Sequence, residues 1–241
     1  MLENKKVIIF DMDGTLIDSV WIWNAIDEEL IKRAGTISLG NENIAKQRDD
    51  ALKRFRDIPD SYLAYCDFLR EKYQSNLTKE EIKSLRYEIA DDYLKNKVDY
   101  KPNAEKVLKY LKQKGYTLVI ASTTLRRCID IYTTENKNLM EKANFKDIFS
   151  LILTKDDVTA KKPSPEVHEK IMEILKVKPE ECLVIEDALI GVEAAKNAGI
   201  QVAVIYDKYA DGDRDKMNEL SDYQFKNFDE ILEEIKKEIE F

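Results

Sequence analysis

The sequence contains few of the residues on which several enzyme classes depend. Its 241 residues include a single histidine, His168, and three scattered cysteines, Cys66, Cys128 and Cys182. One histidine excludes His-rich zinc sites and leaves a Ser-His-Asp triad possible only through His168. His168 lies in an amphipathic helical pattern, which favours a packing or surface role. Three scattered cysteines indicate reduced thiols rather than disulfides, as is typical of a cytoplasmic protein.

Long apolar runs and excess positive charge are also missing. No apolar stretch approaches the ~20 residues that a membrane-spanning helix needs. The N-terminal MLENKKVIIF leads directly into an expected strand, without the apolar region and cleavage site of a signal peptide. The formal net charge is −8, with the acidic residues spread along the chain, which argues against an electrostatic grip on nucleic acid. We expect a cytoplasmic monomer or weak homodimer that binds neither membranes nor nucleic acid.

The composition and the hydrophobic pattern together predict an α/β fold. The chain is 44% apolar and 36% charged, with only seven glycines and five prolines, as in a folded, helix-rich protein. Five short, β-branched apolar runs are typical of strands covered on both faces. Helix-length segments separate the later strands, so we expect a Rossmann-like, doubly wound parallel sheet of five strands. The predicted strands are residues 7–10, 116–122, 149–154, 182–187 and 201–206.

One long segment has no convincing strand. Residues 19–97 show only helical patterns, and one of these opens with a capping box formed by Thr78 and Glu81. In the remainder of the chain, helix-length segments are expected over residues 126–143, 165–176 and 189–198. We therefore predict an α/β core built from residues 1–18 and 98–241, with an all-helical domain, residues 19–97, inserted after the first strand.

Polar residues follow four of the predicted strands at the point where each strand ends. In a doubly wound sheet these carboxyl ends meet at one edge, where ligands bind. Carboxylates from two strands can hold Mg²⁺, and a lysine can neutralise a transferring phosphoryl group. Hydroxyl groups can bind phosphate oxygens, and a carboxylate can attack phosphorus. The residues are Asp11, Asp13, Ser122, Thr123, Thr124, Lys161, Lys162, Glu186 and Asp187.

Four motifs carry a family resemblance. In this order, FDMDGTLID, LVIASTT, AKKPSPE and VIEDALIGVEAAKNAGI resemble the haloacid dehalogenase superfamily. The spacing is similar to that of the subfamily with a helical cap after the first strand, which includes phosphoglycolate phosphatase and β-phosphoglucomutase. The resemblance covers about two thirds of the chain, and the helical segment matches only in position and character.

The resemblance implies a role for each matching residue. Asp11 corresponds to a nucleophile that forms an aspartyl-phosphate, and Asp13 to the general acid and base. Ser122, with Thr123 and Thr124, corresponds to the phosphate-binding hydroxyl cluster, and Lys162, rather than Lys161, to the charge-stabilising lysine. Glu186 and Asp187 correspond to the acidic Mg²⁺ site, to which Asp11 and the main-chain carbonyl of Asp13 also belong. Gly14 permits the sharp turn that brings the backbone close to phosphate.

The type of reaction is predicted by comparing two positions of this chain, Asp13 and Trp23, with the pattern of the family. Relatives that attack carbon need only the first aspartate, so Asp13 favours phosphoryl transfer. Mutase-like sequences carry a histidine shortly after the first motif, where this chain has Trp23. We predict a Mg²⁺-dependent phosphatase of a small, sugar-phosphate-like metabolite. The alternatives are a β-phosphoglucomutase-like mutase and a non-catalytic phospho-acceptor or binding protein.

Substrate choice is expected to depend on the helical segment, because the core motifs contact only the phosphate. Trp23 and Arg48 are the predicted substrate-binding residues there. Aromatic residues at helical spacing are also common in helix-packing cores, and basic clusters on helices are often solvated faces. The further candidates for lining a cleft are Trp21, Lys53, Arg54 and Tyr62.

Overall fold

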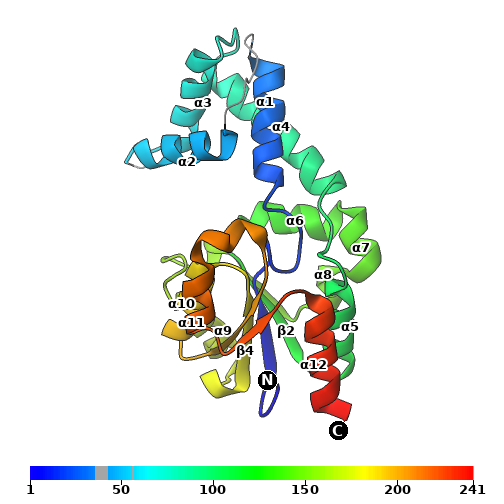
Figure 1. Ribbon diagram of the computed structural model, residues 1–241. Coiled ribbons are helices and arrows are strands. Elements are labelled where there is room, and N and C mark those ends of the chain that lie inside the picture. The colour runs from blue at the N-terminus through cyan, green and yellow to red at the C-terminus, as the bar shows by residue number, and fades with distance from the viewer. Residues whose placement is uncertain (36–42, 56, 241) are drawn as a thin grey trace. The chain divides into compact units, whose positions relative to one another are not determined.

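The computed structural model describes residues 1–35, 43–55 and 57–240 and divides the chain into two compact units. Residues 1–20 and 98–241 form an α/β unit, and residues 21–97 form a helical unit (Figure 1). Within the described residues, no helix is both long enough and apolar enough to cross a membrane.

The α/β unit is built on a parallel sheet whose strand order is β3-β2-β1-β4-β5-β6. The chain builds β2 and β3 outward on one side of β1 and then β4, β5 and β6 on the other. The strand order therefore reverses at the central β1, the place where ligands bind in such sheets. The strands are β1 (Val7–Phe10), β2 (Thr117–Ala121), β3 (Leu151–Leu153), β4 (Cys182–Glu186), β5 (Gln201–Ile205) and β6 (Tyr223–Phe225).

Helices cover both faces of this sheet, because every central strand is apolar on both sides (Figure 1). On one face, Val7 and Ile9 pack in a core cluster that includes Ile171 and Val192 from helices α9 and α10. On the other face, Phe10 meets Phe149 edge to face at 6.4 Å. The helices are α5 (Ala104–Gln113), α6 (Arg126–Thr134), α7 (Lys137–Ala143), α8 (Phe145–Ile148), α9 (Glu166–Leu175), α10 (Leu189–Asn197), α11 (Arg214–Leu220) and α12 (Phe228–Glu240).

Short 3₁₀ turns connect several of these elements: η1 (Lys155–Asp157), η2 (Pro179–Glu181) and η3 (Lys208–Asp213). The expected fold class is confirmed, but the sheet has six strands rather than five. The additional strand, β6, is only three residues long and pairs on one side with β5. An edge strand of this kind has no continuous apolar run and therefore lacks the pattern by which buried strands are found.

The helix expected over residues 126–143 is also interrupted. Helix α6 ends at Thr134, and the fully buried Asn136 starts α7 by accepting a hydrogen bond from the N–H of Leu139 at 2.9 Å. Its side-chain NH₂ donates to the carbonyl oxygen of Val98 at 3.0 Å. An asparagine side chain that caps a helix competes with continuation of the preceding one, and this explains the break.

The helical unit contains α1 (Ile22–Ala34), α2 (Ile44–Arg54), α3 (Ser61–Lys72) and α4 (Lys79–Asn96). The predicted capping box at the start of α4 is confirmed, since the N–H of Glu81 donates to Thr78 Oγ1 and the N–H of Thr78 donates to Glu81 Oε2. Apolar residues at helical spacing, among them Ile26, Leu30 and Ile89, form its core. Helix α4 packs against both α1 and α3.

Candidate active site

Three neighbouring strands deliver the candidate residues to one edge of the α/β unit. Phe10, the last residue of β1, is in register with Ile120 of β2 and Ile185 of β4. Asp11 and Glu186 directly follow Phe10 and Ile185, and Ser122 comes two residues after Ile120. All three therefore lie at the same edge of the sheet. The parallel registers explain why residues far apart in the sequence converge, because aligned parallel strands end at the same edge.

Lys162 is the centre of the buried polar network. Its ammonium donates to Asp11 Oδ1 at 2.7 Å, to Glu186 Oε1 at 2.7 Å and to the carbonyl oxygen of Ala121 at 2.9 Å. All three donor positions of the ammonium are thereby used. Burial alone would lower the pKa of Lys162, but Asp11 and Glu186 outweigh burial and raise it, so this lysine stays charged. The adjacent Lys161 is exposed.

Carboxylates outnumber this lysine. Asp11, Glu186 and Asp187 are buried, and each offers a carboxylate oxygen within 4.8 Å of the others. Burial, followed by the charge of Glu186, raises the pKa of Asp11 to about 7, although Lys162 opposes the shift. Burial and the charges of Glu186 and Asp11 likewise raise the pKa of Asp187. Crowded, buried carboxylates that outnumber the ammonium bound to them are the donor set that fits a hard divalent cation.

The three carboxylates are not equally available to a cation. Glu186 Oε1 accepts from Lys162, and Oε2 accepts from the N–H groups of Asp187 at 2.8 Å and Ala188 at 2.9 Å. Gly191 makes room for this arrangement, because a Cβ at that position would overlap the Glu186 carboxylate. Asp11 and Asp187 are thus better placed for direct contact with a metal, and Glu186 fixes the lysine.

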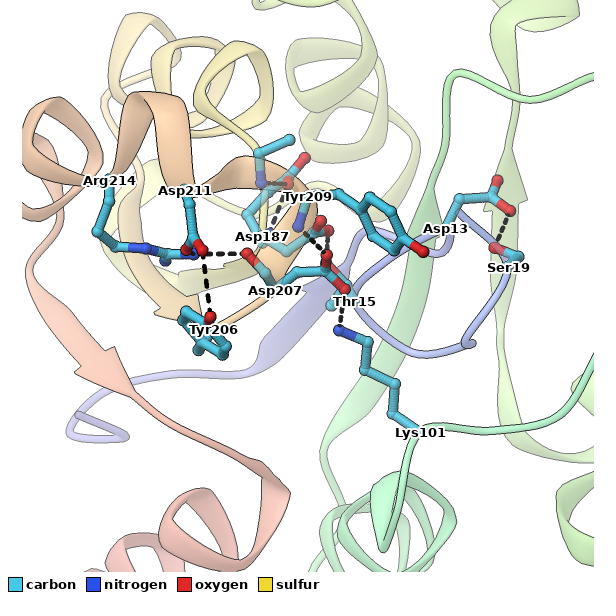
Figure 2. Close-up of polar contacts among 12 residues, drawn as sticks. Asp13, Thr15, Ser19, Lys101, Asp187, Tyr206, Asp207, Tyr209, Asp211 and Arg214 are labelled. Carbon is cyan, nitrogen blue, oxygen red and sulfur yellow. Dashed lines mark hydrogen bonds and ion pairs between the residues drawn. The ribbon is translucent and has the colours of Figure 1, made fainter. Parts of the chain in front are cut away.

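Asp187 is itself held by the loop that follows β1 (Figure 2). The hydroxyl of Thr15, which is fully buried, donates to Asp187 Oδ1 at 2.6 Å. Gly14 has φ of +90°, and a Cβ on it would lie less than 3.0 Å from Asp187 Oδ2. The glycine is needed for two reasons, the left-handed backbone and the close approach of this carboxylate.

Asp13 lies apart from the three clustered carboxylates and has its own partner (Figure 2). The hydroxyl of the buried Ser19 donates to Asp13 Oδ1 at 2.5 Å. Burial raises the pKa of Asp13, against the opposing hydrogen bonds from Ser19 and Thr124. A carboxyl group with a raised pKa can hold a proton closer to neutral pH, as a general acid must.

The predicted phosphate-binding hydroxyls differ in their exposure. Ser122 is 3% exposed, and its N–H donates to the carbonyl oxygen of Leu153, which fixes the residue beside β3. Its Oγ accepts from the N–H of Thr124 at 3.1 Å. Thr123 is exposed and Thr124 is half-buried. The segment thus turns tightly after β2 and presents hydroxyl groups next to the carboxylates.

The other predicted substrate-binding residues lie in the helical unit and have partners there. Arg48 Nη1 contacts Asp27 Oδ2 at 3.2 Å, and the fully buried Asp27 also accepts from Arg86 Nε at 2.8 Å. The guanidinium of Arg86 lies 5.9 Å from the ring centroid of Trp23 and 4.8 Å from that of Tyr62. Asp27 and Arg86 are buried and Arg48, Trp23 and Tyr62 are half-buried around them, and the role of Trp23 and Arg48 in substrate binding stays a prediction.

The remaining candidates of the helical unit are placed separately. Trp21 packs edge to face against Tyr93 with ring centroids 6.2 Å apart. Lys53 and Arg54 are exposed, and Arg54 lies 5.5 Å from the ring centroid of Phe55. A groove of about 410 Å³ beside α2 and α3 includes Arg54 and Phe55 among its lining residues. The basic cluster on α2 is largely a solvated face.

Sequence reasoning did not find Thr15 and Ser19, which bind the side chains of Asp187 and Asp13. A signal existed, since Thr15 lies within FDMDGTLID and Ser19 directly follows it. Hydroxyl groups close to a carboxylate can donate hydrogen bonds that fix its orientation. His168 has the packing role expected of it, because it is fully buried on α9.

Comparison with known proteins gives a consistent result. A family model described as haloacid dehalogenase-like hydrolase matches residues 8–205. The chain is 31% identical over 202 residues to a phosphoglycolate phosphatase of Aquifex aeolicus, covering 83% of this chain and 84% of that protein. It is 26% identical over 196 residues to a phosphorylated carbohydrates phosphatase of Thermotoga maritima, covering 81% and 82%.

Solved structures show the same fold. A hydrolase from Deinococcus radiodurans, determined with bound phosphate and sodium, superimposes with a TM-score of 0.69 at 17% sequence identity. The superposition covers 97% of this chain and 96% of that one.

Proposed function

Because the chain belongs to the haloacid dehalogenase-like hydrolases and is an enzyme of the phosphatase type, we propose that it is a Mg²⁺-dependent phosphatase acting through an aspartyl-phosphate. The observation that carries this proposal is the position of Lys162, which contacts both Asp11 and Glu186 at 2.7 Å. A buried ammonium held against a carboxylate at a strand end is suited to neutralise a phosphoryl group bound there.

Asp11 is the proposed nucleophile. Its Oδ1 is held by Lys162, so the side chain cannot turn away from the edge of the sheet. Within the described residues no hydrogen bond occupies Oδ2, which leaves that oxygen to attack phosphorus. The bond from phosphorus to the leaving oxygen breaks as the new bond to Asp11 forms, and water later releases phosphate from Asp11.

Asp13 is the proposed general acid and base. Its carboxyl group donates a proton to the leaving oxygen in the first step and accepts one from the attacking water in the second. The hydrogen bond from Ser19 fixes the orientation of this side chain, and the raised pKa of Asp13 favours the protonated form that the first step requires.

Ser122, Thr123 and Thr124 are proposed to bind phosphate oxygens through hydroxyl and N–H groups. Asp11, Asp187 and the main-chain carbonyl of Asp13 would hold Mg²⁺, with Glu186 behind them. When bound, the cation supplies charge neutralisation for the phosphate and the attacking carboxylate. Thr15 keeps Asp187 oriented toward this position through its 2.6 Å hydrogen bond.

A small phosphorylated metabolite is the proposed substrate. Two relatives are named for phosphoglycolate and for phosphorylated carbohydrates, and this supports a sugar-phosphate-like compound. The helical unit is proposed to act as a cap that selects the substrate, with Trp23 and Arg48 as contributors. A cap that closes would exclude water while the aspartyl-phosphate forms, before water is needed to release phosphate.

The test is hydrolysis of p-nitrophenyl phosphate with Mg²⁺, with EDTA and with the Asp11→Asn variant. We expect turnover that needs the metal and falls by about 10³-fold or more in Asp11→Asn, because the amide cannot form the acyl-phosphate. Asp18→Asn, the same change at an exposed aspartate nearby, is the matched control and retains wild-type turnover. Full activity of Asp11→Asn would refute the covalent mechanism. Conversion of hexose 1-phosphates without phosphate release would favour a mutase instead.

A further inference from the structure

A second buried lysine–carboxylate pair lies at the same edge of the α/β unit. Lys101 Nζ contacts Asp207 Oδ2 at 2.5 Å, and the two side chains are only 13% and 7% exposed. Lys101 precedes α5, and its N–H donates to the carbonyl oxygen of Leu16 at 2.8 Å. Asp207 follows β5. The pair therefore joins the loop after β1 to the loop after β5.

Asp207 is fixed by contacts other than the lysine. Its Oδ1 accepts from the N–H of Tyr209 at 2.8 Å, which starts the η3 turn. Its carbonyl oxygen accepts from Arg214 Nη2 at 2.8 Å, and the Arg214 guanidinium lies 4.8 Å from the ring centroid of Tyr206. These contacts leave the carboxylate little freedom to turn, so the ammonium of Lys101 is held in a defined place.

The pair lies beside the carboxylate proposed to hold the metal. Figure 2 shows Lys101 and Asp207 next to Thr15, whose hydroxyl donates to Asp187. Through Thr15 the pair thus lies close to the Asp187 carboxylate, and Asp207 balances the charge of Lys101.

We propose that Lys101 and Asp207 act in opposite directions on the divalent-cation affinity of the site containing Asp187, and that within the pair each charge cancels the effect of the other. This inference rests on the proposed metal site. Because the pair is neutral as a whole, a bound cation interacts mainly with its own ligands. Removal of Lys101 would leave the buried charge of Asp207, which attracts a cation. Removal of the Asp207 charge would leave the ammonium, which repels one.

The experiment measures the dissociation constant for Mg²⁺ by titration calorimetry on the full chain without substrate. Lys101→Met is expected to tighten binding, and Asp207→Asn to weaken it, each by roughly threefold to thirtyfold. The double variant Lys101→Met/Asp207→Asn is expected to bind within about twofold of wild type, because the pair is then neutral again. If the pair only maintained the local structure, both single variants would bind Mg²⁺ more weakly. That result would overturn the inference.

Two further variants separate charge from folding. Lys101→Arg keeps the charge and is expected to keep the wild-type dissociation constant; a shift as large as that of Lys101→Met would contradict the proposal. Lys216→Met breaks an exposed pair, 2.5 Å from Glu193, in the same unit and serves as the matched control without effect. If the wild type itself binds no Mg²⁺, the proposed metal site fails. If it binds but the single variants do not shift in opposite directions, only this inference fails.

Discussion

The two units bury charge in opposite ways. In the α/β unit a single ammonium, that of Lys162, faces several clustered carboxylates, so negative charge is in excess. In the helical unit a single carboxylate, Asp27, lies between the guanidinium groups of Arg48 and Arg86. The excess negative charge in the α/β unit attracts a metal cation. In the helical unit the positive charges belong to the arginines, which contact one carboxylate and nearby aromatic rings.

The origin of the buried groups explains this difference. In the α/β unit they leave the ends of aligned strands, where the sheet topology gathers them for any ligand at that edge. In the helical unit they come from the facing sides of helices, and Arg86 lies 4.8 Å from the ring centroid of Tyr62. We therefore propose that buried charge at the sheet edge takes part in the reaction, and that buried charge between the helices holds them together. Three substitutions test this comparison.

The largest effect is expected from Lys162→Ala, which removes the ammonium bound to Asp11. We expect turnover of p-nitrophenyl phosphate to fall by about 10³-fold, as when a charge-stabilising group is lost from a phosphoryl-transfer site. The adjacent Lys161→Ala is the matched control, because Lys161 is exposed, and its turnover is expected to stay within about twofold of wild type. The reverse ranking would show that the other lysine acts at the site.

A large loss of stability is expected from Asp27→Ala in the helical unit. It leaves Arg86, which is 5% exposed, without its carboxylate, and breaking a buried pair in this way costs about 3–5 kcal/mol. Urea unfolding followed by tryptophan fluorescence measures the effect, since both tryptophans of the chain lie in this unit.

Two observations check the interpretation of Asp27→Ala. Asp50→Ala breaks an exposed pair with Lys46 and is expected to leave the free energy of unfolding close to that of wild type. Mg²⁺ affinity of Asp27→Ala is expected to match wild type, because the clustered carboxylates lie in the other unit. A variant as stable as wild type would show that the buried group does not hold the helices together.

A smaller effect, on the pH dependence of stability, is expected from His168. This residue shows what burial does to a titratable side chain in the α/β unit. Its side chain is fully buried, and neither ring nitrogen has a hydrogen-bond partner among the residues that the structure describes. Burial, with a contribution from Lys162, lowers the pKa of His168 to about 3. Below pH ~6.5 His168 is therefore protonated in the unfolded chain but stays neutral in the folded chain. The free energy of unfolding decreases as pH falls through this range.

At pH 5 protonation of His168 in the unfolded chain lowers the free energy of unfolding by about 2 kcal/mol. His168→Leu removes the titrating group, and we expect its stability to fall less than that of wild type between pH 7.5 and pH 5. Urea unfolding followed by circular dichroism at both pH values measures the difference. The comparison is simple because the chain has no other histidine. Equal pH dependence of the two proteins would show that His168 is protonated in the fold.

Much of the fold and of the candidate site could be predicted. The five buried strands were found because each is a continuous apolar run, and their parallel order required the ends to meet at one edge. The capping box of Thr78 and Glu81 was found because it depends only on residues three apart. Strand β6 was missed because it is not a continuous apolar run and pairs only with β5. The break at Asn136 was missed although its cap is local, since the N–H of Leu139 donates to the Asn136 side chain.

The sequence by itself determined which chemical groups the chain carries to the edge of its sheet, because strand ends and motif spacing are local properties. Only the tertiary structure decided which groups meet. Lys162 and Asp11 are 151 residues apart, and Lys101 and Asp207 are 106 apart. Contacts across such separations depend on how helices and strands pack, and no local pattern records them. That is why Asp11 could be proposed as the nucleophile from its motif, whereas the lysine–aspartate pair beside the proposed metal-binding Asp187 became visible only in the folded chain.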